Sequence, residues 1–138
     1  MMKFDLKQPM TVFARVEGEY GVVRELSAMI DLNSTYCLLF AKDAIDLGYP
    51  QAANRAREFR SVRPDECPYL LGMRGIESSI LFTLKKVSVG NLTFQNVKTV
   101  SLEMEPARML PFDMILGQSF LKNTTLHYDG ENGVVSIS

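Results

Sequence analysis

The chain has 138 residues, of which 46% are hydrophobic and 22% charged, so it is long enough to bury a core and unlike a disordered chain. Fifteen basic and sixteen acidic residues leave a net charge of −1, and the basic residues are spread along the chain, so nothing favours nucleic acid or an anionic membrane as a partner. These values predict a single domain over residues 1–138.

Targeting signals and metal ligands are scarce in the sequence. No stretch reaches the roughly 20 apolar residues of a membrane span, and the first ten residues lack the apolar core of a signal peptide, so we expect a cytoplasmic protein. Cys37 and Cys67 are too few for a disulfide framework or a four-thiolate zinc site, and we interpret both as reduced thiols. His127 is the only histidine, so a serine-histidine triad has one place to form.

The first 31 residues predict two paired strands. Residues 10–16, MTVFARV, alternate apolar and polar side chains, which is the period of a half-buried strand. Residues 17–21, EGEYG, are typical of a turn, and residues 24–31, RELSAMID, alternate again and end at Asp31. We expect the two segments to form an antiparallel pair.

The pattern then changes to that of a short helix. Phe40, Ala44 and Leu47 fall at helical spacing, and Gly48 and Pro50 are stop signals. The polar residues 51–68 that follow contain two prolines and predict a loop with at most one helical turn. The arginines of this loop favour simple solvent exposure over contact with an acidic partner; they are Arg55, Arg57, Arg60 and Arg63.

The second half of the chain again predicts strands. Residues 78–104 are rich in β-branched and apolar residues and are interrupted by Gly90-Asn91, which favours a tight hairpin turn. Residues 112–123, FDMILGQSFLKN, predict a buried strand, a break at Gly117 and a short helical segment, and residues 126–138 predict a closing hairpin. Many short strands with turns at close intervals indicate an all-β barrel or sandwich with little helix.

Two motifs carry a resemblance to a known family. Asp31 ends an apolar strand and is followed by Leu32, Asn33, Ser34 and Thr35 and then a helix, and a later apolar pair precedes a glycine in Ile115-Leu116-Gly117. This order, over roughly residues 10–137, resembles the retropepsin-like aspartic protease family. The resemblance implies a closed retropepsin-like β-barrel with one or two short helices, in which the later motif crosses beside the Asp31 loop.

The resemblance also implies a mechanism. Two copies of the chain would pair about a twofold axis, and each would supply one Asp31 as the catalytic residue. One carboxylate acts as a base toward water while the other, protonated, polarises the scissile carbonyl. A flap would cover an extended peptide or protein substrate, and its best candidate is Gly72, Met73, Arg74 and Gly75. The family uses neither a metal ion nor an organic cofactor.

The sequence departs from the family directly after Asp31. Leu32 replaces the usual threonine or serine, so the hydroxyl that braces the two loops across the axis is missing. Asn33 replaces a glycine that often has positive φ, and asparagine is the residue next best able to adopt that backbone. We expect Asn33 to keep the loop shape and the hydroxyl of Ser34 or Thr35 to donate a hydrogen bond to Asp31.

Three functions stay open at this stage. The first is a homodimeric aspartic endopeptidase, the second a non-catalytic retropepsin-like module that dimerises and binds a peptide or partner protein, and the third a small β-barrel binding protein of another kind. Asp31 alone is also typical of a turn or a helix cap. Asp113 and Asp129 are interpreted as turn or strand-end acids, and Asp43 and Asp46 as a solvated helix face rather than a metal site.

Overall fold

The computed structural model describes residues 2–49, 80–102 and 112–138. The predicted flap at Gly72 to Gly75, the predicted loop at 51–68 and Cys67 lie outside the described residues. The elements in chain order are β1 (Met2–Asp5), β2 (Thr11–Glu17), β3 (Val23–Ile30), β4 (Cys37–Phe40), α1 (Ala41–Asp46), β5 (Ile80–Val89), β6 (Leu92–Leu102), β7 (Met114–Leu116), α2 (Gln118–Leu121), β8 (Leu126–Asp129) and β9 (Val134–Ile137).

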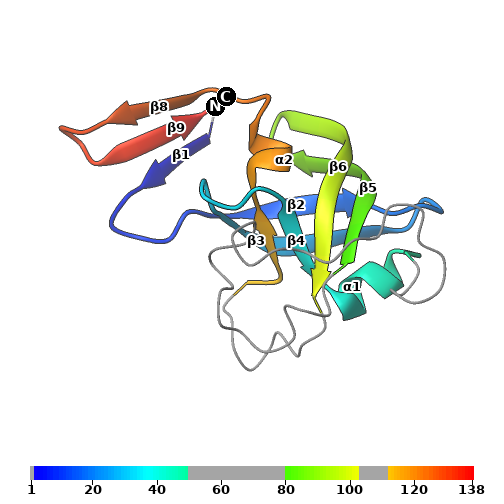
Figure 1. Cartoon of the computed structure of the whole chain (residues 1–138). Helices are drawn as coiled ribbons and strands as arrows, with labels where there is room; N and C mark the ends of the chain where they lie inside the picture. The colour runs from blue at the N-terminus through cyan, green and yellow to red at the C-terminus, as the bar shows by residue number, and fades with distance from the viewer. Residues whose placement is uncertain (1, 50–79, 103–111) are drawn as a thin grey trace.

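Six strands close into a barrel in the order β2-β3-β7-β4-β6-β5 (Figure 1). The antiparallel pairs β2–β3 and β5–β6 confirm the two predicted hairpins, and Gly90 takes the positive φ of 57° that its tight turn requires. The short strand β7 lies between β3 and β4, parallel to the first and antiparallel to the second. The closed all-β barrel with two short helices is therefore confirmed.

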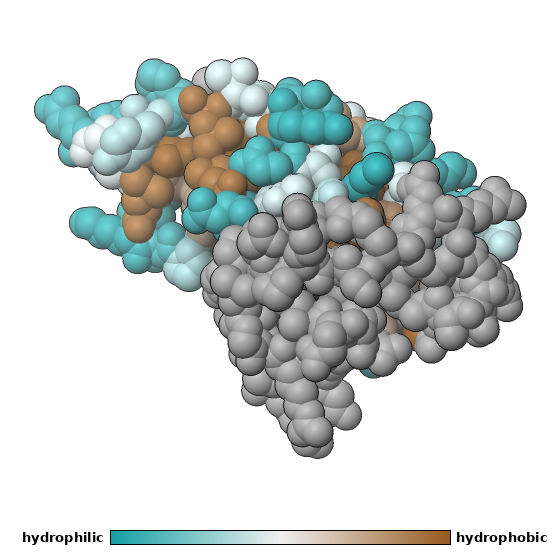
Figure 2. Space-filling view, viewed as in Figure 1, coloured by the Kyte–Doolittle hydropathy of each residue, from teal (hydrophilic) through white to brown (hydrophobic). Residues whose placement is uncertain are grey.

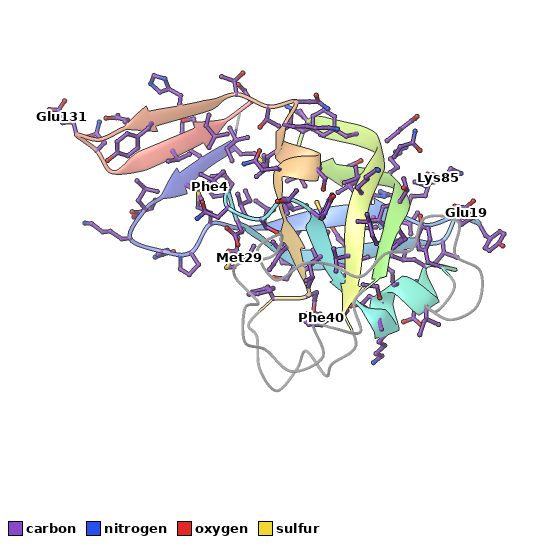
Figure 3. The ribbon with its side chains drawn as sticks, viewed as in Figure 1. Phe4, Glu19, Met29, Phe40, Lys85 and Glu131 are labelled. Carbon is purple, nitrogen blue, oxygen red and sulfur yellow. The ribbon has the colours of Figure 1, made fainter. Side chains whose placement is uncertain are left out.

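The two ends of the chain form a second, three-stranded sheet in the order β1-β9-β8 (Figure 1). The β8–β9 hairpin was predicted, and Glu131 marks its tip, which projects away from the barrel (Figure 3). Strand β1 was not predicted. It has only four residues, too few for an alternating pattern to stand out, and it forms because Met2 and Phe4 pair with Ile137 and Val135 of β9.

The barrel wall is apolar on both faces where β3, β7 and β4 meet. The interior cluster includes Ala28, Leu39 and Leu116, while the outer face carries a second buried cluster. That outer cluster consists of Met29 and Phe40, both labelled in Figure 3, with Leu38, Leu81, Val100, Phe112 and Ile115. Strands that are buried on both faces have continuous apolar sequences, as CLLF and MIL do here.

The predicted start of the helix is wrong because β4 is buried on both faces. Phe40 was placed on the helix because it stands four residues before Ala44, but it is the last residue of β4 and α1 begins at Ala41. An apolar run that is buried on both sides has no alternation to separate it from a helical pattern. The predicted stop is confirmed, since the helix ends at Asp46 and Gly48 has φ of 90°.

Candidate active site

Asp31 lies directly after β3, at the start of the loop that leads to β4. Its backbone N–H donates a hydrogen bond to the Leu116 carbonyl at 3.0 Å, which continues the parallel pairing of Ile30 with Leu116. The structure therefore brings Asp31 together with Ile115, Leu116 and Gly117, which are 84 or more residues later in the chain. Pairing of the end of β3 with the short buried strand β7 fixes where the carboxylate leaves the barrel.

The Asp31 carboxylate closes its own turn. Its Oδ1 accepts the backbone N–H of Asn33 at 2.9 Å, and the Ser34 N–H donates to the Asp31 carbonyl at 3.3 Å. A hydrogen bond from an amide to an ionised carboxylate is among the stronger ones, and this arrangement is a common turn for aspartate. Asp31 is half-buried while Leu32 and Asn33 are exposed, so the carboxylate is oriented and still reaches the surface.

The Ser34 alternative for the donor to Asp31 is wrong, and so is the positive φ considered for Asn33. The Ser34 hydroxyl donates to the Tyr36 carbonyl at 2.7 Å, and its single proton is therefore not available to Asp31. Asn33 does not take a positive φ, because Asn96 is the only non-glycine residue in the described ranges that does. A left-handed residue is unnecessary here since the carboxylate itself closes the turn. Thr35 is exposed.

The first two residues of helix α2 donate hydrogen bonds to backbone carbonyls of the Asp31 loop. The Gln118 side chain donates from Nε2 to the Leu32 carbonyl at 2.7 Å, and the Gln118 N–H donates to the Ser34 carbonyl at 2.7 Å. The next residue, Ser119, donates its N–H to the Thr35 carbonyl at 3.0 Å. Neither residue stands out in the sequence, because a polar pair after a glycine is the ordinary start of any helix.

Gly117 permits this close approach. An added Cβ would lie 2.3 Å from the Tyr36 carbonyl oxygen and 2.6 Å from that of Ser34, closer than real contacts allow. Its φ of −104° is available to any residue, so space rather than backbone conformation requires the glycine. The motif Ile115-Leu116-Gly117 therefore supports the loop in two ways, through a backbone hydrogen bond and through the absence of a side chain.

Cys37 lies at the end of the loop, where β4 begins. Its N–H donates to the Ser119 hydroxyl at 2.9 Å, and that hydroxyl donates in turn to the Lys98 carbonyl at 2.6 Å. Burial raises the pKa of the Cys37 thiol, more than the nearby Ser119 hydrogen bond lowers it. A neutral buried thiol is unreactive, in keeping with the expectation of an ordinary reduced cysteine.

The Gln118 side chain is expected to stiffen the Asp31 loop. Gln118→Ala removes the bond to the Leu32 carbonyl, which should cost about 0.5 to 1.5 kcal/mol of stability and speed amide exchange at Asn33 and Ser34. Urea denaturation and hydrogen exchange followed by NMR measure the two effects. Lys122→Ala, an exposed change in the residue after α2, is the control. Unchanged exchange at Asn33 in Gln118→Ala would contradict the assignment.

Other polar sites in the described ranges give weaker support for a catalytic role than the Asp31 loop does. A surface hollow of about 300 Å³ opens over β2 and β5, away from the loop, and is lined by Arg15, Glu17, Val23, Lys86, Ser88 and Thr93. The described ranges contain no group of three or more histidine, cysteine, aspartate or glutamate side chains placed to hold a metal ion. Burial and the charges of Asp113 and Asp46 raise the pKa of Asp43, a pattern of acids in mutual repulsion. None of the helices in these ranges is long and apolar enough to cross a membrane.

The closed barrel, the sheet of chain ends and the braced aspartate loop define a fold seen in aspartic proteases. The structure is similar to the crystal structure of a retropepsin-like aspartic protease from Rickettsia conorii, with a TM-score of 0.59 and 18% identity over 97% of this chain and 86% of that one. It is also similar to the retroviral protease-like domain of Ddi1 from Leishmania major, with a TM-score of 0.51 and 13% identity over 95% of this chain and 89% of that one.

The chain therefore has a retropepsin-like fold, which confirms the predicted resemblance at the level of the fold. No protein-family model and no curated protein sequence matches it. The third alternative, a small β-barrel of an unrelated kind, is removed by this result.

Proposed function

We propose that the chain is an aspartic endopeptidase that works as a homodimer, with Asp31 of each copy forming the catalytic pair. The observation that carries the proposal is the Asp31 loop: a half-buried carboxylate leaves the barrel between β3 and β7, and backbone hydrogen bonds from both sides fix its position. Preorganised groups of this kind are what a catalytic carboxylate needs, because they spare the reorganisation that a loose side chain requires.

The proposed reaction needs a second carboxylate. One Asp31 takes a proton from water as the water oxygen bonds to the peptide carbonyl carbon, while the other, protonated, gives its proton to the carbonyl oxygen. The first Asp31 then gives its new proton to the nitrogen as the C–N bond breaks, and the second takes a proton back from a hydroxyl on the tetrahedral carbon, which leaves a new carboxyl group and a new amine. Asp113 does not supply this group, because its Oδ2 accepts the N–H of Ser27, four residues before Asp31 on β3, at 3.0 Å. A twofold pair of chains supplies it by symmetry.

The proposed substrate class rests on the retropepsin-like fold. Retropepsin-like sites hold an extended peptide by its main chain, and alternate side chains enter apolar pockets. We propose peptides with apolar residues at the cleaved bond, a reaction without metal or organic cofactor, and a cytoplasmic location.

A second candidate function rests on the exposed Leu32 beside the carboxylate. An apolar side chain at this place, where a hydroxyl is usual, also suits a module that dimerises and binds a peptide or partner protein without cutting it. Both candidates use the same paired loops. They differ in whether the two Asp31 carboxylates catalyse peptide hydrolysis.

The test is cleavage of a mixed library of extended peptides from acidic to neutral pH, by protein whose solution mass is measured in the same buffers. Mass spectrometry of the products is expected to show cuts between apolar residues, made by the dimer. A dimeric protein that cuts nothing at any pH would overturn the endopeptidase and favour the binding module.

A further inference from the structure

In the proposed homodimer, Leu32 would be buried at the interface between the two chains. Consecutive Cα atoms are about 3.8 Å apart, so when two Asp31 carboxylates approach within about 3 Å, the residues that follow them lie at the same interface. In the single chain 38% of Leu32 is exposed. Leu32 is thus an exposed apolar residue directly beside the candidate catalytic group, and the proposed dimer would remove it from water.

The loop presents Leu32 on a fixed backbone. The Leu32 carbonyl accepts the Gln118 side chain at 2.7 Å, and the preceding Asp31 N–H is bound to Leu116 at 3.0 Å. Among its neighbours in the loop, Ser34 is buried, and the exposed residues Asn33 and Thr35 have polar side chains. A preorganised side chain loses little conformational freedom when it binds, which favours association.

From these observations we propose that Leu32 packs against the partner's Leu32 across the twofold axis and that this apolar contact holds the two Asp31 loops together. The inference rests on the proposed homodimer. In a twofold interface a residue near the axis meets its own copy, so one exposed leucine produces a self-complementary contact. Well-packed residues near the centre of an interface, where water is excluded, contribute most of the affinity in many complexes.

The experiment measures the dissociation constant of the dimer by sedimentation equilibrium for the wild type, Leu32→Ala, Leu32→Asp and Leu32→Met. We expect the alanine variant to weaken the dimer at least about tenfold and the aspartate variant at least about a hundredfold. Methionine keeps an apolar side chain of similar volume and should restore the affinity to within about threefold of the wild type. Urea denaturation of the monomers should show little change, because the side chain is partly exposed in the single chain.

Ile45 provides the matched control. It is 43% exposed and lies on α1, which follows the opposite end of β4 from the Asp31 loop. Ile45→Asp should leave the dissociation constant within about threefold of the wild type. An equal loss of affinity in Ile45→Asp and Leu32→Asp would overturn the inference, because the effect would then not be specific to the axis.

The outcomes also separate this inference from the proposed function. A wild type that cuts peptides as a dimer, together with a Leu32→Asp variant that dimerises equally well, overturns the Leu32 contact alone. A wild type that stays monomeric at every concentration overturns the homodimer and with it both proposals.

Discussion

Replacing Gly117 with alanine is expected to lower the free energy of unfolding by at least about 3 kcal/mol. The new Cβ would lie 2.3 Å and 2.6 Å from two backbone carbonyl oxygens, those of Tyr36 and Ser34. Neither atom can move cheaply, since the Ser34 carbonyl already accepts the Gln118 N–H at 2.7 Å and both residues belong to the tied loop. The variant should therefore lose the loop geometry as well as stability.

Gly130→Ala is the control for this change. A Cβ at Gly130 would first meet the Tyr128 ring, at 3.2 Å, and that ring belongs to an exposed side chain that can turn aside. We expect a change within about 0.5 kcal/mol. Urea denaturation with an unchanged slope measures both variants. Equal stability of the two would contradict the view that β7 and the loop are in contact at Gly117.

Much of the barrel could be predicted from the sequence because its hairpins have one buried face. Strand β2 alternates cleanly, β3 alternates from Glu25 to Ala28, and Gly90-Asn91 marks the turn between β5 and β6. The predictions were wrong or missing for strands that do not show one buried and one exposed face along the sequence. Strand β4 is buried on both faces and merged with the predicted helix, and β1 is too short to show a period, although it pairs along its full length with β9.

The Asp31 loop was predictable in its order of motifs but not in its hydrogen bonds. The resemblance placed Ile115-Leu116-Gly117 beside Asp31, and the structure brings them together. The buried Ser34 hydroxyl donates to the Tyr36 carbonyl, and the order of residues in the sequence does not distinguish this acceptor from the Asp31 carboxylate. Gln118 acts through a carbonyl 86 residues away, a contact that no local pattern encodes.

The sheet of chain ends exposes apolar residues that the sequence pattern did not distinguish from core residues. Figure 2 shows hydrophobic atoms gathered over the part of the view that the sheet of chain ends occupies in Figure 1. The exposed large apolar residues of that sheet and its connection are Leu6, Leu126 and Tyr128. Leu126 and Tyr128 pair with Ile137 and Val135, so they share the face that packs on the barrel and extend it into solvent.

Replacing Asp31 with asparagine is expected to reduce peptide cleavage by at least about a thousandfold while leaving the fold intact. The amide oxygen of asparagine can still accept the Asn33 N–H at the place of Oδ1, so the turn should persist. A neutral amide cannot take a proton from water or return one to the leaving nitrogen. The measurement is kcat/KM on the best library peptide, with urea denaturation to show that stability is retained. Asp46→Asn, an exposed change on α1, should keep full activity.

Mixing the two proteins tests whether both copies of Asp31 act together. When wild type and Asp31→Asn are combined in equal amounts and exchange subunits freely, about half of the wild-type chains pair with a variant chain. Each mixed dimer has one carboxylate and one amide at the axis, so it cannot hold the base and the acid at once. Activity should then fall to about half of that shown by the same amount of wild type alone. A chain that cut peptides by itself would keep all of its activity in the mixture, and that result would locate the second catalytic group within one copy.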